Sequence, residues 1–255
     1  MIKKITLIGV VSILALGVTA CSLNFRDMGI PFIATSTNTA LPPAKLTPTP
    51  TFPPKTGVVG NQLQTEIQED NTTLLTDAEL GYQAVFSSEW FLLIADSPIE
   101  EQLAAAFGEQ ISDETRTFVS KQSQQPGFRV IALDYTHKYS NRPLAYFTLN
   151  FLPDPATADS EMLEVLDKTI EVIPTRTPEA DVIYQNVEIN AHGLEYGKMI
   201  LNQTDSDTGI QLKKVVALFK VSDGLLTFTG VAWQEDYNKL ENVFQKAINS
   251  IQTID

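Results

Sequence analysis

The chain has 255 residues and carries 31 acidic side chains against 18 basic ones, which gives a formal net charge of −13 at pH 7. A protein this acidic repels the phosphate backbone of nucleic acids, so we expect no nucleic-acid partner. Its single cysteine excludes an intramolecular disulfide, and the core must therefore be stable without a covalent cross-link.

The first twenty residues have the pattern of an export signal. Lys3 and Lys4 precede an apolar run over 5–16, which is too short to span the roughly 30 Å of hydrocarbon in a bilayer. The tetrapeptide VTAC, which ends at Cys21, resembles the lipobox of bacterial lipoproteins. The resemblance implies cleavage of a signal peptide over 1–20 and acylation of Cys21. The alternative is an ordinary signal peptide with an incidental cysteine.

Acylation at Cys21 makes the membrane a partner of the mature chain. Each buried CH₂ group of an acyl chain contributes about 0.8 kcal/mol, and two or more chains together give stable attachment. We therefore expect an exported protein that is lipid-anchored to the cell membrane or the outer membrane, with its domain on the extracytoplasmic side. Removal of Lys3 and Lys4 with the signal peptide changes the net charge to −15.

Residues 21–65 have the composition of a tether. They include the stretch TNTALPPAKLTPTPTFPPKTG, which is rich in proline and threonine and shows no apolar periodicity. Such a segment buries too little apolar surface to offset the entropy of ordering, so we expect it to be disordered or extended. At about 3.1 Å per residue when extended, and less when coiled, it holds the domain on the order of 100 Å from the membrane. One globular domain is then expected over 66–255.

Hydrophobic periodicity predicts strands and helices in alternation up to residue 173. Strands are expected over 82–86, 90–94, 128–135 and 144–152, and helices from 97, over 113–122 and over 160–172. The first helix has a clear start, with Ser97 as its N-cap, Pro98 at the first position and Glu100 at the third. The third helix is expected to end before Pro174.

The last third of the chain reads as an antiparallel meander closed by a helix. Strands are expected over 182–189, 194–203, 210–221 and 225–233, and a helix over 236–250. The dipeptide DG at 223–224 between the last two strands is a strong hairpin signal. Helices at both ends of a run of paired strands predict the α+β class, with an antiparallel β-sheet sandwiched between α-helices.

Three stretches resemble PsbP-like domains. These are GYQAVFSSEW at 81–90, VEINAHGLEY at 187–196, and the final hairpin with its helix at 219–228 and 244–251. The resemblance implies a PsbP-like α/β/α sandwich, a fold also found in DcrB-like bacterial lipoproteins. Ser87 stands where the family usually has proline, and Ile251 where it usually has phenylalanine. PsbP proteins assist photosystem II, but no residues of this chain are recognised as carrying that role.

Residues that carry catalytic or metal chemistry are few. The two histidines, His137 and His192, lie in expected loops and far apart in the sequence. Asp205 and Asp207 form a D-x-D-x-G loop that is a weak Ca²⁺ candidate, with a polar hairpin turn as the favoured interpretation. No metal site and no cofactor are otherwise expected, and no pattern of nucleophile and base predicts an enzyme.

The sequence therefore predicts a membrane-anchored envelope lipoprotein that acts as a non-catalytic binding or accessory module for an envelope protein partner. The alternative is a carrier or sensor of a small apolar ligand, held in a cleft between the sheet and the helix over 236–251.

Overall fold

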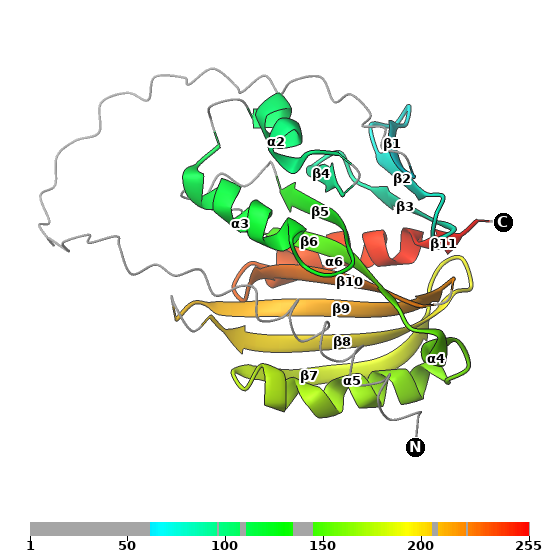
Figure 1. The fold of residues 1–255 in the computed structure, drawn as a ribbon. Helices are drawn as coiled ribbons and strands as arrows, with labels where there is room; N and C mark the ends of the chain where they lie inside the picture. The colour runs from blue at the N-terminus through cyan, green and yellow to red at the C-terminus, as the bar shows by residue number, and fades with distance from the viewer. Residues whose placement is uncertain are drawn as a thin grey trace, which may run out of the picture.

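The computed structural model describes residues 62–95, 97–107, 111–134, 145–205, 209–222 and 224–254 (Figure 1). Two antiparallel sheets form its framework. The small sheet consists of β1 (Leu63–Ile67), β2 (Thr73–Asp77), β3 (Tyr82–Phe86) and β11 (Gln252–Thr253), in that order. The signal peptide, Cys21 and most of the expected tether lie outside the described residues.

The large sheet has seven strands in the order β4-β5-β6-β10-β9-β8-β7. Their bounds are Trp90–Ile94 for β4, Phe128–Asp134 for β5, Ala145–Pro153 for β6, Ala180–Ile189 for β7, Glu195–Thr204 for β8, Gln211–Val221 for β9 and Gly224–Trp233 for β10. The helices are α2 (Ile99–Phe107), α3 (Asp113–Ser123), α4 (Pro155–Ala158), α5 (Met162–Arg176) and α6 (Tyr237–Ser250).

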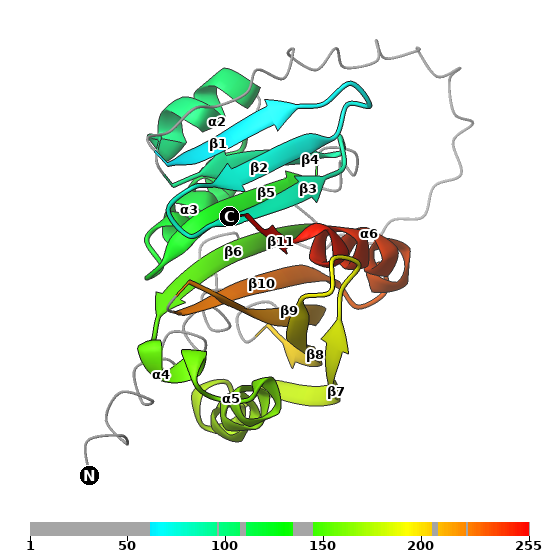
Figure 2. The same cartoon turned by 90° about the vertical axis from the view of Figure 1, so that its right-hand side faces the viewer.

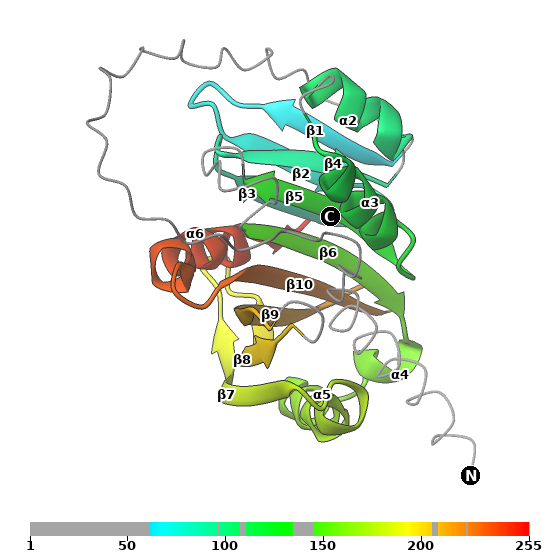
Figure 3. The ribbon, with the colours of Figure 1, turned by 90° about the vertical axis from the view of Figure 1, so that its left-hand side faces the viewer.

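The large sheet is the middle layer of the domain. One of its faces is covered by α6 and by the small sheet, whereas α2, α3 and α5 lie against the opposite face (Figures 2 and 3). Side chains alternate between the two faces along each strand, as the pleat requires. In β6, for example, Phe147 and Leu149 point into the cluster beneath α6, and Tyr146 points toward α2 and α3.

Aromatic rings fill the layer beneath α6. Phe147 stacks between Phe86 and Phe228 at centroid distances of 4.8 and 5.2 Å. The helix lies so close to the sheet that a methyl group added at Gly230 would be 2.8 Å from the ring of Phe244. Glycine is therefore required at this position by close packing, and the apolar side chains of the closing helix, such as Leu240, Phe244 and Ile248, are buried against the sheet.

The elements expected between residues 82 and 250 are present, and the antiparallel α+β class is confirmed. Three details differ. The layer beneath the large sheet contains a second sheet as well as a helix. The first strands, β1 and β2, were not predicted, and β1 begins at Leu63, before the expected domain start at residue 66.

The third expected helix, α5, continues through Pro174 to Arg176. Proline lacks a backbone N–H, so the helix loses one hydrogen bond there. That loss falls in the last turn, where the buried side chain of Ile173 holds the helix to the sheet and the N–H of Thr177 still donates to the Ile173 carbonyl at 2.7 Å. No helix among the described residues is long and apolar enough to cross a membrane.

Side chains take the place of a neighbouring strand at two sheet edges. The amide of Gln102 accepts from the N–H of Ile94 at 3.0 Å and donates to its carbonyl at 2.8 Å, at the end of β4. The hydroxyl of Ser250 likewise accepts from the N–H of Val85 at 2.8 Å and lies 2.9 Å from its carbonyl oxygen. The backbone N–H and C=O groups that have no partner strand at these two places therefore form hydrogen bonds within the domain.

Candidate functional site

The most exposed part of the large sheet is its edge strand β7. Among the described residues, no strand pairs with β7 on its outer side. Three large apolar side chains on this strand face solvent: Ile183 is 46% exposed, Tyr184 39% and Ile189 71%. Other large apolar side chains in the described domain are mostly buried, so this concentration on one edge distinguishes β7 as a candidate binding surface.

The pairing of β7 with β8 determines which backbone groups point outward. The N–H of Asn190 donates to the Leu194 carbonyl at 3.0 Å at the hairpin end. In an antiparallel ladder such bonded pairs recur at every second residue. The N–H and C=O groups of Gln185, Val187 and Ile189 therefore point away from β8. A β-bulge between Val182 and Tyr184 interrupts this pattern at the other end of the strand.

The hairpin that carries this edge is fixed to the rest of the domain by Asn190. Its side-chain oxygen accepts from the N–H groups of His192 and Leu194, both at 3.0 Å. Its amide nitrogen donates to the carbonyl of Ile251 at 2.6 Å, just beyond the end of α6. Asn190 is only 6% exposed, so these bonds lie in a protected environment and position the β7–β8 hairpin against the helix.

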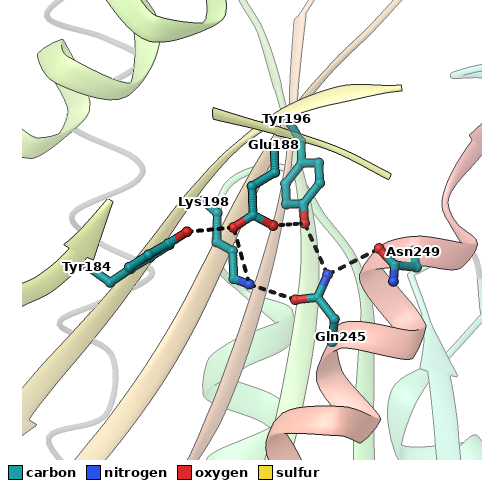
Figure 4. Close-up of polar contacts among 6 residues, drawn as sticks. All are labelled: Tyr184, Glu188, Tyr196, Lys198, Gln245 and Asn249. Atoms are coloured by element: carbon teal, nitrogen blue, oxygen red, sulfur yellow. Dashed lines mark hydrogen bonds and ion pairs between the residues drawn. The ribbon is translucent and has the colours of Figure 1, made fainter. Parts of the chain in front are cut away.

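On the face of β7 and β8 that adjoins α6, six polar side chains form a connected network (Figure 4). Glu188 is at its centre and accepts from the hydroxyls of Tyr184 at 2.8 Å and Tyr196 at 2.6 Å. The ammonium of Lys198 lies 3.5 Å from the same carboxylate and donates to Gln245 at 2.7 Å. Gln245 in turn donates to Tyr196 at 3.0 Å and to Asn249 at 3.1 Å.

The pKa shifts in this network make it poorly suited to general acid–base catalysis. Burial by itself would raise the pKa of Glu188, but the two tyrosine hydroxyls and Lys198 outweigh it and lower that pKa below its ordinary value. Burial, together with donation to Glu188, raises the pKa of Tyr196. A carboxylate that already holds two donors is a poor proton acceptor, and the network is suited instead to holding β7, β8 and α6 in one arrangement.

The chain around β7 is strongly acidic. Residues 159–195 contain nine acidic and two basic side chains, a large part of the negative charge of the whole protein. The acids are Asp159, Glu161, Glu164, Asp167, Glu171, Glu179, Asp181, Glu188 and Glu195. Many of them are solvent-exposed on α5 and at the ends of β7, so the edge lies in a negative potential that reaches about one Debye length into solution.

A groove near the other edge of the large sheet is a second candidate site. A groove of about 850 Å³ lies between the start of α2, the end of α3 and the ends of β5 and β6, with Ile99, Phe128 and Phe151 among its lining residues. Its volume is in the range of small-molecule sites. Arg129 also lines it, but the guanidinium donates to Asp77 at 2.9 Å through two nitrogens and pairs with Glu79 at 2.9 Å.

This position differs from the one expected for a small ligand. The sequence suggested a cleft between the closing helix and the sheet, whereas α6 packs directly on the sheet through residues such as Leu240, Phe244 and Ile248. The groove described above lies instead at the ends of β5 and β6, between the start of α2 and the end of α3.

Two of the candidate site residues from the sequence, Asp205 and His192, are among the described residues. Cys21, His137 and Asp207 lie outside the described residues. Asp205 is 7% exposed and begins the turn after β8, where its N–H donates to the Ile210 carbonyl at 2.8 Å. Within the described ranges, no group of three or more His, Cys, Asp or Glu side chains is placed to hold a metal ion. His192 is exposed at the tip of the β7–β8 hairpin.

No protein-family profile matches the chain, and no characterised protein matches it in sequence. Solved structures are similar in fold. The cyanobacterial PsbP protein (CyanoP) of Synechocystis sp. PCC 6803 is 12% identical, and the match covers 78% of this chain and 96% of that one, with a TM-score of 0.46. The resemblance noted in the sequence is to PsbP-like domains as well.

Two proteins of Pseudomonas aeruginosa are also similar. Protein PA94, of unknown function, is 14% identical over 47% of this chain and 88% of that one, with a TM-score of 0.36. The T6SS immunity protein TplEi is 12% identical over 76% of this chain and 77% of that one, with a TM-score of 0.34. Similarity of this degree concerns the fold, and none of these proteins' functions is carried over to this chain.

Proposed function

We propose that this chain is a membrane-anchored envelope lipoprotein that binds an envelope protein partner and has no catalytic activity of its own. The acylated Cys21 would hold it to the membrane, and residues 21–65 would carry the domain away from the bilayer on the extracytoplasmic side. The observation that carries the binding role is the exposed edge strand β7, on which Ile183 is 46% and Ile189 71% exposed, and which has no neighbour on its outer side among the described residues.

The polar network beside β7 supports a binding role over a catalytic one. Its hydroxyls and its carboxylate satisfy one another, and the lowered pKa of Glu188 together with the raised pKa of Tyr196 leaves no poised base or nucleophile in it. A rigid, pre-organised surface is what a protein-binding edge requires, because less conformational entropy is then lost on association.

Site-specific photo-cross-linking in the native envelope tests this proposal. A cross-linking amino acid is placed at Ile189 on β7 or, as a matched surface control, at Glu66 on β1 of the small sheet, which is also exposed. We expect one envelope protein to be captured from Ile189 and not from Glu66. Equal products from both positions, or none from Ile189, would refute the binding surface. A Cys21→Ala variant should lose the acyl mass and be released from the membrane fraction.

The groove beside α2 and α3 supports a second candidate, a carrier or sensor of a small molecule. Its 850 Å³ and its mixture of apolar and polar lining fit a ligand of a few hundred daltons. Native mass spectrometry of the gently extracted lipoprotein should then show a bound small mass, and Phe128→Trp, which fills the groove, should remove it. A bare acylated chain would exclude this role and leave the protein-binding one untouched.

A further inference from the structure

We propose that β7 takes up an extended, basic segment of the partner protein as an eighth strand of the large sheet. This inference rests on the proposed function and specifies how the partner is bound. It starts from the outward-pointing backbone groups of Gln185, Val187 and Ile189, three alternate residues at which an added strand forms its ladder.

Side chains complete strand pairing at two other places in the domain, whereas the outer side of β7 has no partner strand among the described residues. Gln102 completes the end of β4, and Ser250 completes the free part of β3. Exposed edges in natural proteins are usually protected by lysine, proline or a bulge. The segment Ala180–Ile189 contains no lysine, arginine or proline, and its bulge and Asp181 protect only the first part. The part from Gln185 to Ile189 is therefore free to pair.

The side chains that flank this open segment provide contacts on both faces. Residues of β7 point to the same face of the sheet as the β8 residues with which they pair. Gln185, Val187 and Ile189 therefore lie on the α5 side, and Tyr184 and Glu188 lie on the α6 side. An added strand with alternating apolar residues would bury Ile189 on the α5 side and pack against Tyr184 on the α6 side. Such cross-strand pairs contribute roughly 0.2–1 kcal/mol each in antiparallel sheets.

Charge determines which kind of segment fits. The nine acids and two bases of residues 159–195 surround the edge with negative potential. A basic segment is attracted to it, whereas a second copy of this chain would bring the same acids into contact and is repelled. The chain's own tether over 21–65 is also a poor strand, because its many prolines lack the N–H that a ladder requires.

A pair of substitutions at Gln185 separates backbone pairing from side-chain contact. Gln185→Pro in the full-length chain removes one outward N–H and leaves the β8 ladder intact, since proline is tolerated where the N–H faces solvent. Gln185→Ala keeps the N–H and serves as the matched control. The probe is a fluorescent ten-residue peptide of alternating valine and threonine with two lysines at each end, and its binding is followed by fluorescence anisotropy.

We expect the lysine-flanked peptide to bind the wild type and Gln185→Ala with dissociation constants within about twofold of each other. Its dissociation constant for Gln185→Pro should be at least tenfold higher. A glutamate-flanked version should bind at least tenfold more weakly to the wild type, and a version with N-methylated valines should not bind. Equal binding of Gln185→Pro and Gln185→Ala, or of the N-methylated peptide, would overturn strand addition. Equal binding of the glutamate-flanked peptide would overturn the basic specificity.

Two further outcomes distinguish this inference from the proposed function. If the partner captured from Ile189 is captured equally by Gln185→Pro, the protein still binds a partner but not by strand addition. If the full-length chain sediments as a dimer that Gln185→Pro dissociates, a second copy occupies β7 and the basic-segment inference is wrong.

Discussion

The attachment of the β7–β8 hairpin can be tested by Asn190→Ala. This substitution removes three well-formed hydrogen bonds, two that Asn190 accepts at 3.0 Å and one that it donates to Ile251 at 2.6 Å. At about 1 kcal/mol for each bond, the expected loss is about 3 kcal/mol of unfolding free energy. For a domain of this size that corresponds to a decrease in Tm of roughly 6–12 °C.

The assay is thermal unfolding followed by circular dichroism, with Asn186→Ala as the control. Asn186 is on the same strand and exposed, so its substitution should change stability by less than about 0.5 kcal/mol. Hydrogen exchange at the backbone amides of His192 and Leu194 should also become faster in Asn190→Ala and stay unchanged in the control. If the two variants unfold within a degree of each other, Asn190 does not hold the hairpin and the reasoning is wrong.

Three further predictions concern other parts of the domain. Ser250→Ala leaves the N–H of Val85 without its 2.8 Å acceptor and should cost about 1–3 kcal/mol in urea unfolding, with an unchanged m-value; an unchanged midpoint would contradict this. Gly230→Ala places a methyl group 2.8 Å from the Phe244 ring and should destabilise the domain by about 1–3 kcal/mol. A second substitution, Phe244→Leu, should restore part of this lost stability. If the effects of the two substitutions simply add, the two sites do not touch. The pKa of Glu188 in the folded state is below its ordinary value of 4.5, so its contribution to the unfolding free energy is complete above that pH and is lost as the pH falls through the folded pKa. The stability difference between wild type and Glu188→Gln should therefore be larger at pH 7 than at pH 3. A difference that does not change with pH would refute this.

Local patterns were enough to predict most of the sheet and its helices. Turn signals such as the DG dipeptide at 223–224 separate the strands of the meander from β7 to β10, and α6 carries an apolar stripe that no strand pattern imitates. The strands β1 and β2 were missed because their outward positions are mostly polar and their inward ones include threonine, as at Thr65 and Thr73. Their burial depends on packing under the large sheet, which no short window of sequence contains.

The candidate site was harder to predict than the fold. The motif around Glu188 and Tyr196 was recognised as a hairpin, but its partners on α6 lie about fifty residues further along the chain. The openness of β7 is also a property of the whole sheet, since an edge exists only once the strand order is known. The sequence did carry one signal of this site, the excess of acidic over basic residues at 159–195.

The small sheet has a consequence for the order in which the domain folds. Its strand β11 pairs with β3 through Thr253 and Tyr82, and the N–H of Ile254 donates to the Gly81 carbonyl at 2.9 Å. A chain that emerges N-terminus first, from a ribosome or a membrane channel, therefore exposes β1 to β3 for as long as it takes to deliver about 170 further residues. During that interval these strands have neither α6 nor the fourth strand, β11, to pack against. The nascent domain is therefore most vulnerable to proteases and to misassociation at its N-terminal strands. In the folded domain, by contrast, the most open part of the surface is β7.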